Sequence, residues 1–244
     1  MLNIKMPNKP KILAIIPARG GSKRIPNKNI KKFNGKPLIY YAIKECLKSK
    51  VFSQIVVSTD SLKIKKIAIK YGAEVPFIRP KYLSKDVPTE DVVLHAVKFL
   101  EEENKFYDII FILEPPHVAR KYHHILKAVS VLKKFSIYDS VMTVLKIKER
   151  PEWMLRIKNK FVFPFYNYFF FKNKPYLKYP SSKEFETLYR ASAIVYAIRR
   201  DALFKYKSCT GLKCYPIKIK NTYDLDLDYP EDWKPAEKKF KELF

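Results

Sequence analysis

Two groups of charged side chains, one near each end of the sequence, have the residue types and spacing to act on a phosphate-bearing substrate. The first group surrounds a turn that contains Gly20 and Gly21, and its basic members are Arg19, Lys23, Arg24 and Lys28. Glycine lets the backbone turn tightly and approach a ligand, so N–H groups and positive charge point at the same place. The pattern predicts a phosphate-binding loop, although it matches neither of the two common glycine-rich phosphate motifs. An ordinary strand-to-helix turn with solvated lysines is the alternative.

The second group consists of three aspartates that alternate with leucines near the carboxyl terminus. On an extended backbone this alternation puts Asp224, Asp226 and Asp228 on one side of the chain. Three carboxylates on one side repel one another unless a cation lies among them, and Mg²⁺ typically takes one or two carboxylates together with water and substrate phosphate. The group therefore predicts a magnesium site. A second interpretation stays open, in which Asp228 caps the last helix ahead of Pro230.

Alternating strand and helix patterns must position these two groups. Strands are predicted at 12–16, 54–57, 74–78, 108–113, 140–147, 190–196 and 214–219, and helices at 37–47, 61–71, 89–103, 122–134 and 201–206. Residues 58–60 and Thr89 are expected to cap the helices that follow them. This order favours an α/β fold, with a Rossmann-like, mostly parallel sheet and helices on both faces. Ligands bind beyond the carboxyl ends of such strands, so the glycine turn, residues 58–60, Arg79 and residues 114–120 should meet at one edge.

The composition limits the classes of function. The formal net charge of +25 raises the possibility of nucleic-acid binding, but the lysines are spread from end to end, which favours a generally basic surface. Three cysteines without a Cys-x-x-Cys pairing predict a reducing cytoplasm. No apolar run approaches the roughly 20 residues that a membrane span needs. Residues 1–10 are expected to form a loose tail. We expect the chain to bind neither a membrane nor nucleic acid.

The pattern changes between residues 148 and 188. Residues 152–163 predict a hairpin, and residues 163–171 hold seven aromatic side chains in nine positions. Aromatic residues at this density must be buried, either in the protein's own core or against a partner subunit, and we favour the partner. Stacking on bases is a third interpretation. We expect an inserted dimerisation arm at 148–188 within a nucleotide-binding α/β domain formed by 11–147 and 189–244.

The glycine turn also carries a resemblance to a known family. The run Ile-Ile-Pro-Ala-Arg-Gly-Gly-Ser-Lys from Ile15, followed by Lys28-Asn29, resembles the opening signature of the CMP-sialic acid synthetases, or acylneuraminate cytidylyltransferases. The resemblance continues in Val-Ser-Thr-Asp at 57–60, in residues 71–80, and in the aspartates before Ala236-Glu237. It implies a nucleotidyltransferase fold, CTP as co-substrate, Mg²⁺ as cofactor and a homodimer built through the arm.

Carried over position by position, the resemblance implies three sets of site residues. The expected catalytic residues are Arg19, Lys23, Lys28, Asp226 and Asp228, the two aspartates as metal ligands. The expected nucleotide-binding residues are Ala18, Gly20, Gly21, Ser22, Asn29, Ser58, Asp60, Arg79 and Thr89. The expected sugar-binding residues are Glu114, His117, Arg120, Arg190 and Ser192.

The sequence departs from the family pattern on the sugar side. The family's Leu-Gln-Pro-Thr-Ser-Pro-Leu-Arg stands here as Leu-Glu-Pro-Pro-His-Val-Ala-Arg at 113–120, and Ser192-Ala193 replaces Asn-Gly. The resemblance implies that a nonulosonic acid, such as sialic, legionaminic or pseudaminic acid, attacks the α-phosphate of CTP to give a CMP-sugar for surface polysaccharide. A Kdo-type eight-carbon acid as substrate, or a non-catalytic nucleotide- or nucleic-acid-binding relative, are the alternatives that remain.

Overall fold

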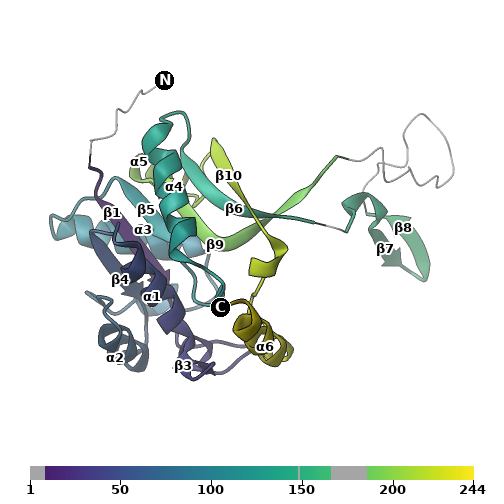
Figure 1. Cartoon of the computed structure of the whole chain (residues 1–244), viewed down its shortest axis with the longest axis horizontal. Helices are drawn as coiled ribbons and strands as arrows, with labels where there is room; N and C mark the ends of the chain where they lie inside the picture. Colours follow the sequence, from purple (N-terminus) through teal and green to yellow (C-terminus); the bar gives the residue numbers. More distant parts are fainter. Residues whose placement is uncertain (1–8, 148, 166–185) are drawn as a thin grey trace. The chain divides into compact units, whose positions relative to one another are not determined.

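The structure is a computed structural model that describes residues 9–147, 149–165 and 186–244 (Figure 1). The chain divides into two compact units, one formed by Met1–Val144 with Ala191–Phe244 and the other by Leu145–Arg190. None of the helices in the described part of the chain has the length and apolar character that a membrane crossing requires.

A six-stranded sheet in the order β10-β6-β9-β5-β1-β4 forms the centre of the first unit. Its strands are β1 (Ile12–Pro17), β4 (Gln54–Ser58), β5 (Ile109–Ile112), β6 (Ser140–Lys146), β9 (Tyr189–Arg199) and β10 (Cys214–Ile219). Strand β1 pairs in parallel with β4 and with β5, whereas β9 runs antiparallel to β5. The expected α/β sheet, with parallel strands leading into the glycine turn, is confirmed.

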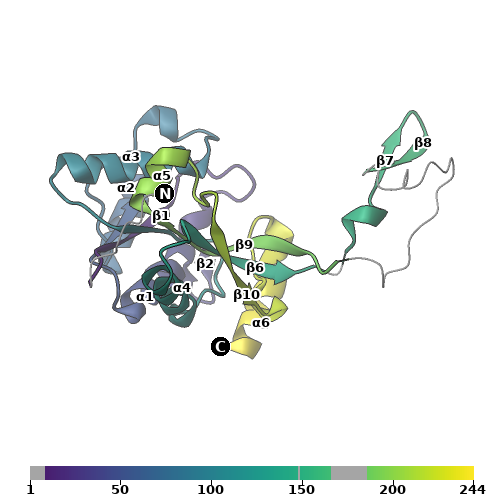
Figure 2. The same ribbon diagram turned by 90° about the horizontal axis from the view of Figure 1, so that it is seen from above.

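Helices cover both faces of this sheet (Figure 2). They are α1 (Leu38–Ser49), α2 (Leu62–Lys70), α3 (Thr89–Glu102), α4 (Tyr122–Lys134), α5 (Arg200–Tyr206) and α6 (Trp233–Leu243). Side chains of β1 alternate between the two faces: Ile12, Ala14 and Ile16 pack in the core with α1 and α4, and Leu13 and Ile15 pack in the core with α3 and α5. Burial on both faces explains why this strand reads as one continuous apolar run.

Short elements complete the described chain. They are β2 (Lys32–Phe33), β3 (Lys36–Pro37), β7 (Leu155–Lys158), β8 (Phe161–Pro164) and the 3₁₀ turns η1 (Lys28–Ile30), η2 (Lys81–Leu83), η3 (Pro151–Trp153), η6 (Asn221–Tyr223) and η7 (Pro230–Asp232). Strands β7 and β8 pair antiparallel and confirm the expected hairpin. Most of the aromatic run at 163–171 lies outside the described residues, as do residues 1–8 of the expected tail.

Three local expectations are wrong. Residues 74–78 form no strand but one isolated bridge between Glu74 and Val56, because Pro76 has no N–H to continue a ladder. Helix α2 is capped by Ser61, whose hydroxyl accepts the Ile64 N–H at 3.4 Å, and not by residues 58–60. Thr89 does not cap α3 but is its first residue.

Candidate active site

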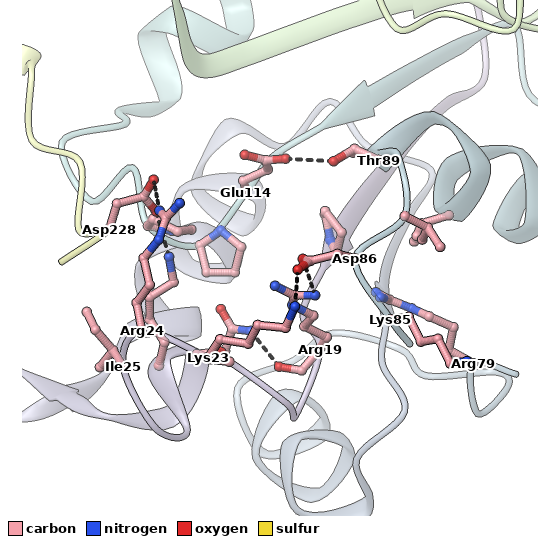
Figure 3. A pocket seen from close by; sticks show the side chains of 18 residues that line it. Arg19, Lys23, Arg24, Ile25, Arg79, Lys85, Asp86, Thr89, Glu114 and Asp228 are labelled. Carbon is pink, nitrogen blue, oxygen red and sulfur yellow. Dashed lines mark hydrogen bonds and ion pairs between the residues drawn. The ribbon is translucent and has the colours of Figure 1, made fainter. Parts of the chain in front are cut away.

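A cleft of about 470 Å³ opens where strands β1 and β5 end (Figure 3). Its walls come from the glycine turn after β1, the segment that leads into α3, the residues after β5, and one aspartate near the carboxyl terminus. Its charged lining residues are Arg19, Lys23, Arg24, Lys28, Arg79, Lys85, Asp86, Glu114 and Asp228. Basic side chains outnumber acidic ones by six to three in this lining, so the cleft favours an anionic ligand.

The glycine turn and the acidic group meet at one end of the cleft. Lys28 Nζ donates to Asp228 Oδ1 at 2.9 Å, and Arg24 donates to Asp228 Oδ2 at 3.2 Å. Lys28 and Asp228 are 200 positions apart in the chain. Partial burial by itself would raise the pKa of Asp228, but the hydrogen bond and charge of Lys28, with that of Arg24, lower it below its ordinary value. The basic glycine turn and Asp228, one member of the acidic group, therefore line the same cleft.

Asp228 does not cap the last helix. Asp232 serves that turn instead, because its carboxylate accepts the backbone N–H groups of Asp228 at 3.0 Å and Tyr229 at 2.7 Å. The Asp228 carboxylate is left to face the cleft, which excludes the helix-cap interpretation.

Asp226 lies on the same side of the chain as Asp228, since the alternating leucines Leu225 and Leu227 are buried on the other side. Burial raises the pKa of Asp226, and the charge of Asp228 adds to this, while His117 opposes it. His117 lies between two carboxylates, with Nδ1 3.8 Å from Asp226 Oδ1 and Nε2 3.7 Å from Glu114 Oε2. The repulsion between the two neighbouring aspartates is the kind that a bound cation relieves.

The carboxylates of the site fit a magnesium ion only if water and substrate phosphates supply the rest of its ligands. Within the described ranges, no group of three or more His, Cys, Asp or Glu side chains could hold a metal ion. Mg²⁺ needs fewer protein ligands than this, because it keeps several waters and binds through one or two carboxylates plus substrate phosphates. Asp226 and Asp228 supply such a pair, next to the basic side chains that would bind the phosphates.

Two of the predicted phosphate-binding side chains, Arg19 and Lys23, share one carboxylate in the lining of the cleft (Figure 3). Arg19 lies 2.7 Å from Asp86 Oδ1, and Lys23 Nζ lies 2.6 Å from Asp86 Oδ2. Hydrogen bonds from Lys23 and Arg19 lower the pKa of Asp86. Asp86 follows the matched segment 71–80 at the place where the family pattern has it, but it was not among the predicted site residues.

Several predicted nucleotide-binding residues shape the glycine turn. The Gly20 N–H donates to Asp60 Oδ1 at 2.7 Å, and the buried Asn29 donates to the Arg19 carbonyl at 2.9 Å. A Cβ on Gly20 would stand 3.0 Å from Ser61 Cβ, whereas nothing lies within 4 Å of one on Gly21. Only the first glycine is therefore required by packing.

Arg79, one of the expected nucleotide-binding residues, is held by the protein's own backbone. Arg79 lines the cleft, but its buried guanidinium donates to the Ser58 hydroxyl and carbonyl, and burial lowers its pKa to about 10. Ser58 and Ala18 are fully buried. Thr89 does line the cleft, and its hydroxyl donates to Glu114 Oε1 at 3.2 Å.

The residues predicted to bind the sugar divide into three groups. Glu114 and His117 lie at the cleft end of β5, where they were expected. Arg120 is 1% exposed, and its guanidinium donates to the carbonyls of Ile194, Glu114 and Ala193, so it holds the backbone and does not line the cleft. Ser192 is also buried. Arg190 belongs to the second unit, as an exposed residue.

An α/β sheet with a cationic cleft beyond its strand ends is the arrangement of the Rossmann-like class of nucleotide-binding folds. Residues 13–243 match the cytidylyltransferase family, to which the chain belongs, and it is accordingly a nucleotidyltransferase.

Two curated relatives of the chain carry names that state the sugar acid on which they act. The chain is 32% identical over 236 residues to CMP-N,N'-diacetyllegionaminic acid synthase of Legionella pneumophila, covering 93% of this chain and 95% of the relative. It is 52% identical over 99 residues to pseudaminic acid cytidylyltransferase of Campylobacter jejuni, covering 40% and 43%. Among solved structures, CMP-2-keto-3-deoxy-manno-octonic acid synthetase complexed with CTP aligns over 96% of this chain and 100% of its own, with a TM-score of 0.70 and 15% identity. This last likeness shows the fold alone.

Proposed function

We propose that the protein transfers CMP from CTP to a nonulosonic acid, releasing pyrophosphate. The observation that carries the proposal is the cationic cleft in which Lys28 and Asp228 meet, in a chain similar over nearly its whole length to a CMP-legionaminic acid synthase. Kdo is the weaker alternative, because the Kdo enzyme is similar in fold at only 15% identity.

Arg19, Lys23 and Lys28 would hold the triphosphate and neutralise the charge that builds on the departing pyrophosphate. Catalysis of this kind depends on positioning and charge stabilisation rather than on a covalent intermediate. The backbone near Gly21 would add an N–H donor, while the Ser22 N–H closes the turn onto the Gly20 carbonyl at 3.0 Å. Asn29 and Thr89 would hold the turn and the start of α3 in place. Arg79 would support its wall of the cleft through its bonds to Ser58.

Asp226 and Asp228 would hold a magnesium ion. A bound Mg²⁺ polarises a phosphoryl oxygen and lowers the pKa of a coordinated hydroxyl. Lys28 would keep the Asp228 carboxylate ionised and oriented for this role, through the bond already described.

Glu114 and His117 stand where the family pattern differs, and we propose that they contact the sugar acid. Both lie near Asp226, so a sugar bound against them would have its hydroxyl close to the aspartate pair. The departures at this position are the reason to expect a substrate other than sialic acid itself.

A pyrophosphate-release assay tests the proposal. Purified protein with CTP and Mg²⁺ is offered sialic, legionaminic, pseudaminic and Kdo acids, one at a time. We expect release with at least one nonulosonic acid, and mass spectrometry of the CMP-sugar identifies the substrate. Release with Kdo alone would replace the substrate class. No release with any acid, together with salt-sensitive RNA binding, would support a non-catalytic relative.

We also propose a homodimer in the cytoplasm. The hairpin of the second unit exposes apolar side chains, with Ile157 76% and Phe161 68% accessible, which a second copy of the chain would cover. Cys46, Cys209 and Cys214 are all unpaired, as a reducing compartment requires. Sedimentation of the wild type and of Ile157→Asp tests the dimer: a dimeric wild type and a monomeric variant are expected, and a dimeric variant would exclude this contact.

A further inference from the structure

Asp86 binds two cations of the cleft, Arg19 and Lys23, which are not the cations that Asp228 binds. Each of its carboxylate oxygens takes one of them, Oδ1 the Arg19 guanidinium and Oδ2 the Lys23 ammonium (Figure 3). This is the bridging arrangement that two oxygens of a phosphate group would adopt on the same side chains. The carboxylate therefore imitates the anion for which these cations are suited.

Asp86 is not part of the core. Its side chain is 59% exposed, on the segment between η2 and α3, and Lys85 and Val87 on either side of it also line the cleft. Exposed ion pairs of this kind are individually weak, so an incoming polyanion can exchange for the carboxylate at small cost. A triphosphate carries several negative charges against the single charge of Asp86.

We propose that Asp86 is a built-in counter-anion that competes with the phosphates of the substrate and of the pyrophosphate product for Arg19 and Lys23. The carboxylate holds both side chains between turnovers, gives way to the nucleotide, and returns as pyrophosphate leaves. Asp86 thus lowers the affinity for CTP and for pyrophosphate and promotes product release. The inference rests on the proposed function, which places the triphosphate on these two cations.

The opposite role makes the opposite prediction. If Asp86 only positioned Arg19 and Lys23 for the phosphates, removing its charge would loosen both side chains and weaken phosphate binding. If it competes with the phosphates, removing its charge strengthens their binding. The sign of the change in affinity separates the two roles.

The test is calorimetric titration of wild type, Asp86→Asn and Asp91→Asn with CTP, pyrophosphate and cytidine. Asp91 is the matched control, because it is an exposed aspartate in the first turn of the neighbouring α3 and is absent from the described lining of the cleft. For Asp86→Asn we expect CTP and pyrophosphate to bind about 3- to 10-fold more tightly, the effect of freeing two exposed pairs. Cytidine, which has no phosphate, should bind unchanged, and Asp91→Asn should match wild type throughout.

Inhibition of turnover by pyrophosphate should strengthen in Asp86→Asn by the same factor. Unchanged or weaker binding of both phosphate ligands by Asp86→Asn would overturn the inference, as would an equal gain in Asp91→Asn, which would make the effect one of net charge. If the proposed function is wrong, the wild type releases no pyrophosphate in the release assay described above, which is independent of the titrations. The pyrophosphate titration still decides the role of Asp86 in that case.

Discussion

Replacing Arg120 by methionine should destabilise the protein without removing a substrate contact. The guanidinium donates to the Ile194 carbonyl at 2.5 Å and to the Glu114 carbonyl at 2.7 Å, with a weaker contact to Ala193 at 3.4 Å. These bonds tie the loop after β5 to strand β9. Methionine has a similar length and no donor, so it fills the space and leaves the carbonyls without a partner.

The loss of unfolding free energy in Arg120→Met follows from the two short bonds of the guanidinium. Each buried acceptor left unsatisfied costs about 1–3 kcal/mol, or roughly 2–6 kcal/mol for the pair. Part of this is recovered, because burial disfavours the charge of Arg120, as its pKa lowered to about 10 shows. Removing a desolvated charge returns some stability, which leaves about 2–4 kcal/mol of net loss. For a protein of this size that loss lowers Tm by roughly 5–15 °C.

Thermal and urea unfolding followed by circular dichroism measure this loss, with Arg200→Met as the control. Arg200 forms two bonds to Glu101, at 2.7 and 2.9 Å, but it is 35% exposed and its loss leaves no buried backbone carbonyl unsatisfied, so Arg200→Met should cost less than Arg120→Met. The KM for the sugar acid should stay within about twofold in Arg120→Met at a temperature where both proteins are folded. A normal Tm with a strongly raised KM would refute the reasoning and place the guanidinium in the sugar site.

Three further outcomes are expected. Asp228→Asn should abolish Mg²⁺-dependent turnover. It weakens an exposed pair to Arg24, which contributes about 0.2–1 kcal/mol, and a part-buried pair to Lys28, which contributes more, so a moderate fall in Tm is expected. Turnover that survives a magnesium titration would show that Asp228 holds no metal. Burial lowers the pKa of His124 from 6.5 to about 3, so the native state binds the proton less tightly than the unfolded one. The contribution of neutral His124 to the stability should therefore be fully present above pH 6.5 and be lost towards pH 3, at up to about 1.4 kcal/mol per pH unit. In His124→Gln, the urea midpoint should fall less steeply over this pH range. Gly20→Ala should lose about 1–3 kcal/mol by overpacking against Ser61 while Gly21→Ala melts like wild type, and equal melting temperatures would contradict the packing around the turn.

The sheet and its helices could be predicted because their signals are local and periodic. Strand β1 is one residue longer than expected and α4 has the expected bounds, since apolar spacing reports burial directly. The third predicted strand failed because one proline outweighed the apolar residues around it. Thr89 failed as a cap because its hydroxyl bonds to Glu114, a partner 25 positions away that no local rule could supply.

The candidate site could be predicted in its members but not in their pairings. The basic turn and the aspartates were recognisable by residue type, yet whether an arginine faces a ligand or a backbone carbonyl depends on contacts distant in sequence. Arg120 and Ile194 are 74 positions apart, and Lys23 and Asp86 are 63 apart. For this reason Arg120 was predicted to bind the sugar, and Asp86 was matched to the family pattern without a predicted role.

The contacts between the glycine turn and the carboxyl-terminal segment determine when the cleft can form during synthesis of the chain on the ribosome. Besides the Lys28–Asp228 bond, Trp233 donates to the Lys32 carbonyl at 3.1 Å, and Glu237 accepts the Asn34 N–H at 2.8 Å. One wall of the cleft therefore forms only after about 200 further residues have been translated, although the turn itself leaves the ribosome early. Until then the basic turn lacks its acidic partner from the carboxyl-terminal segment. A chain whose translation stops shortly before that segment would have its sheet complete and its cleft unfinished.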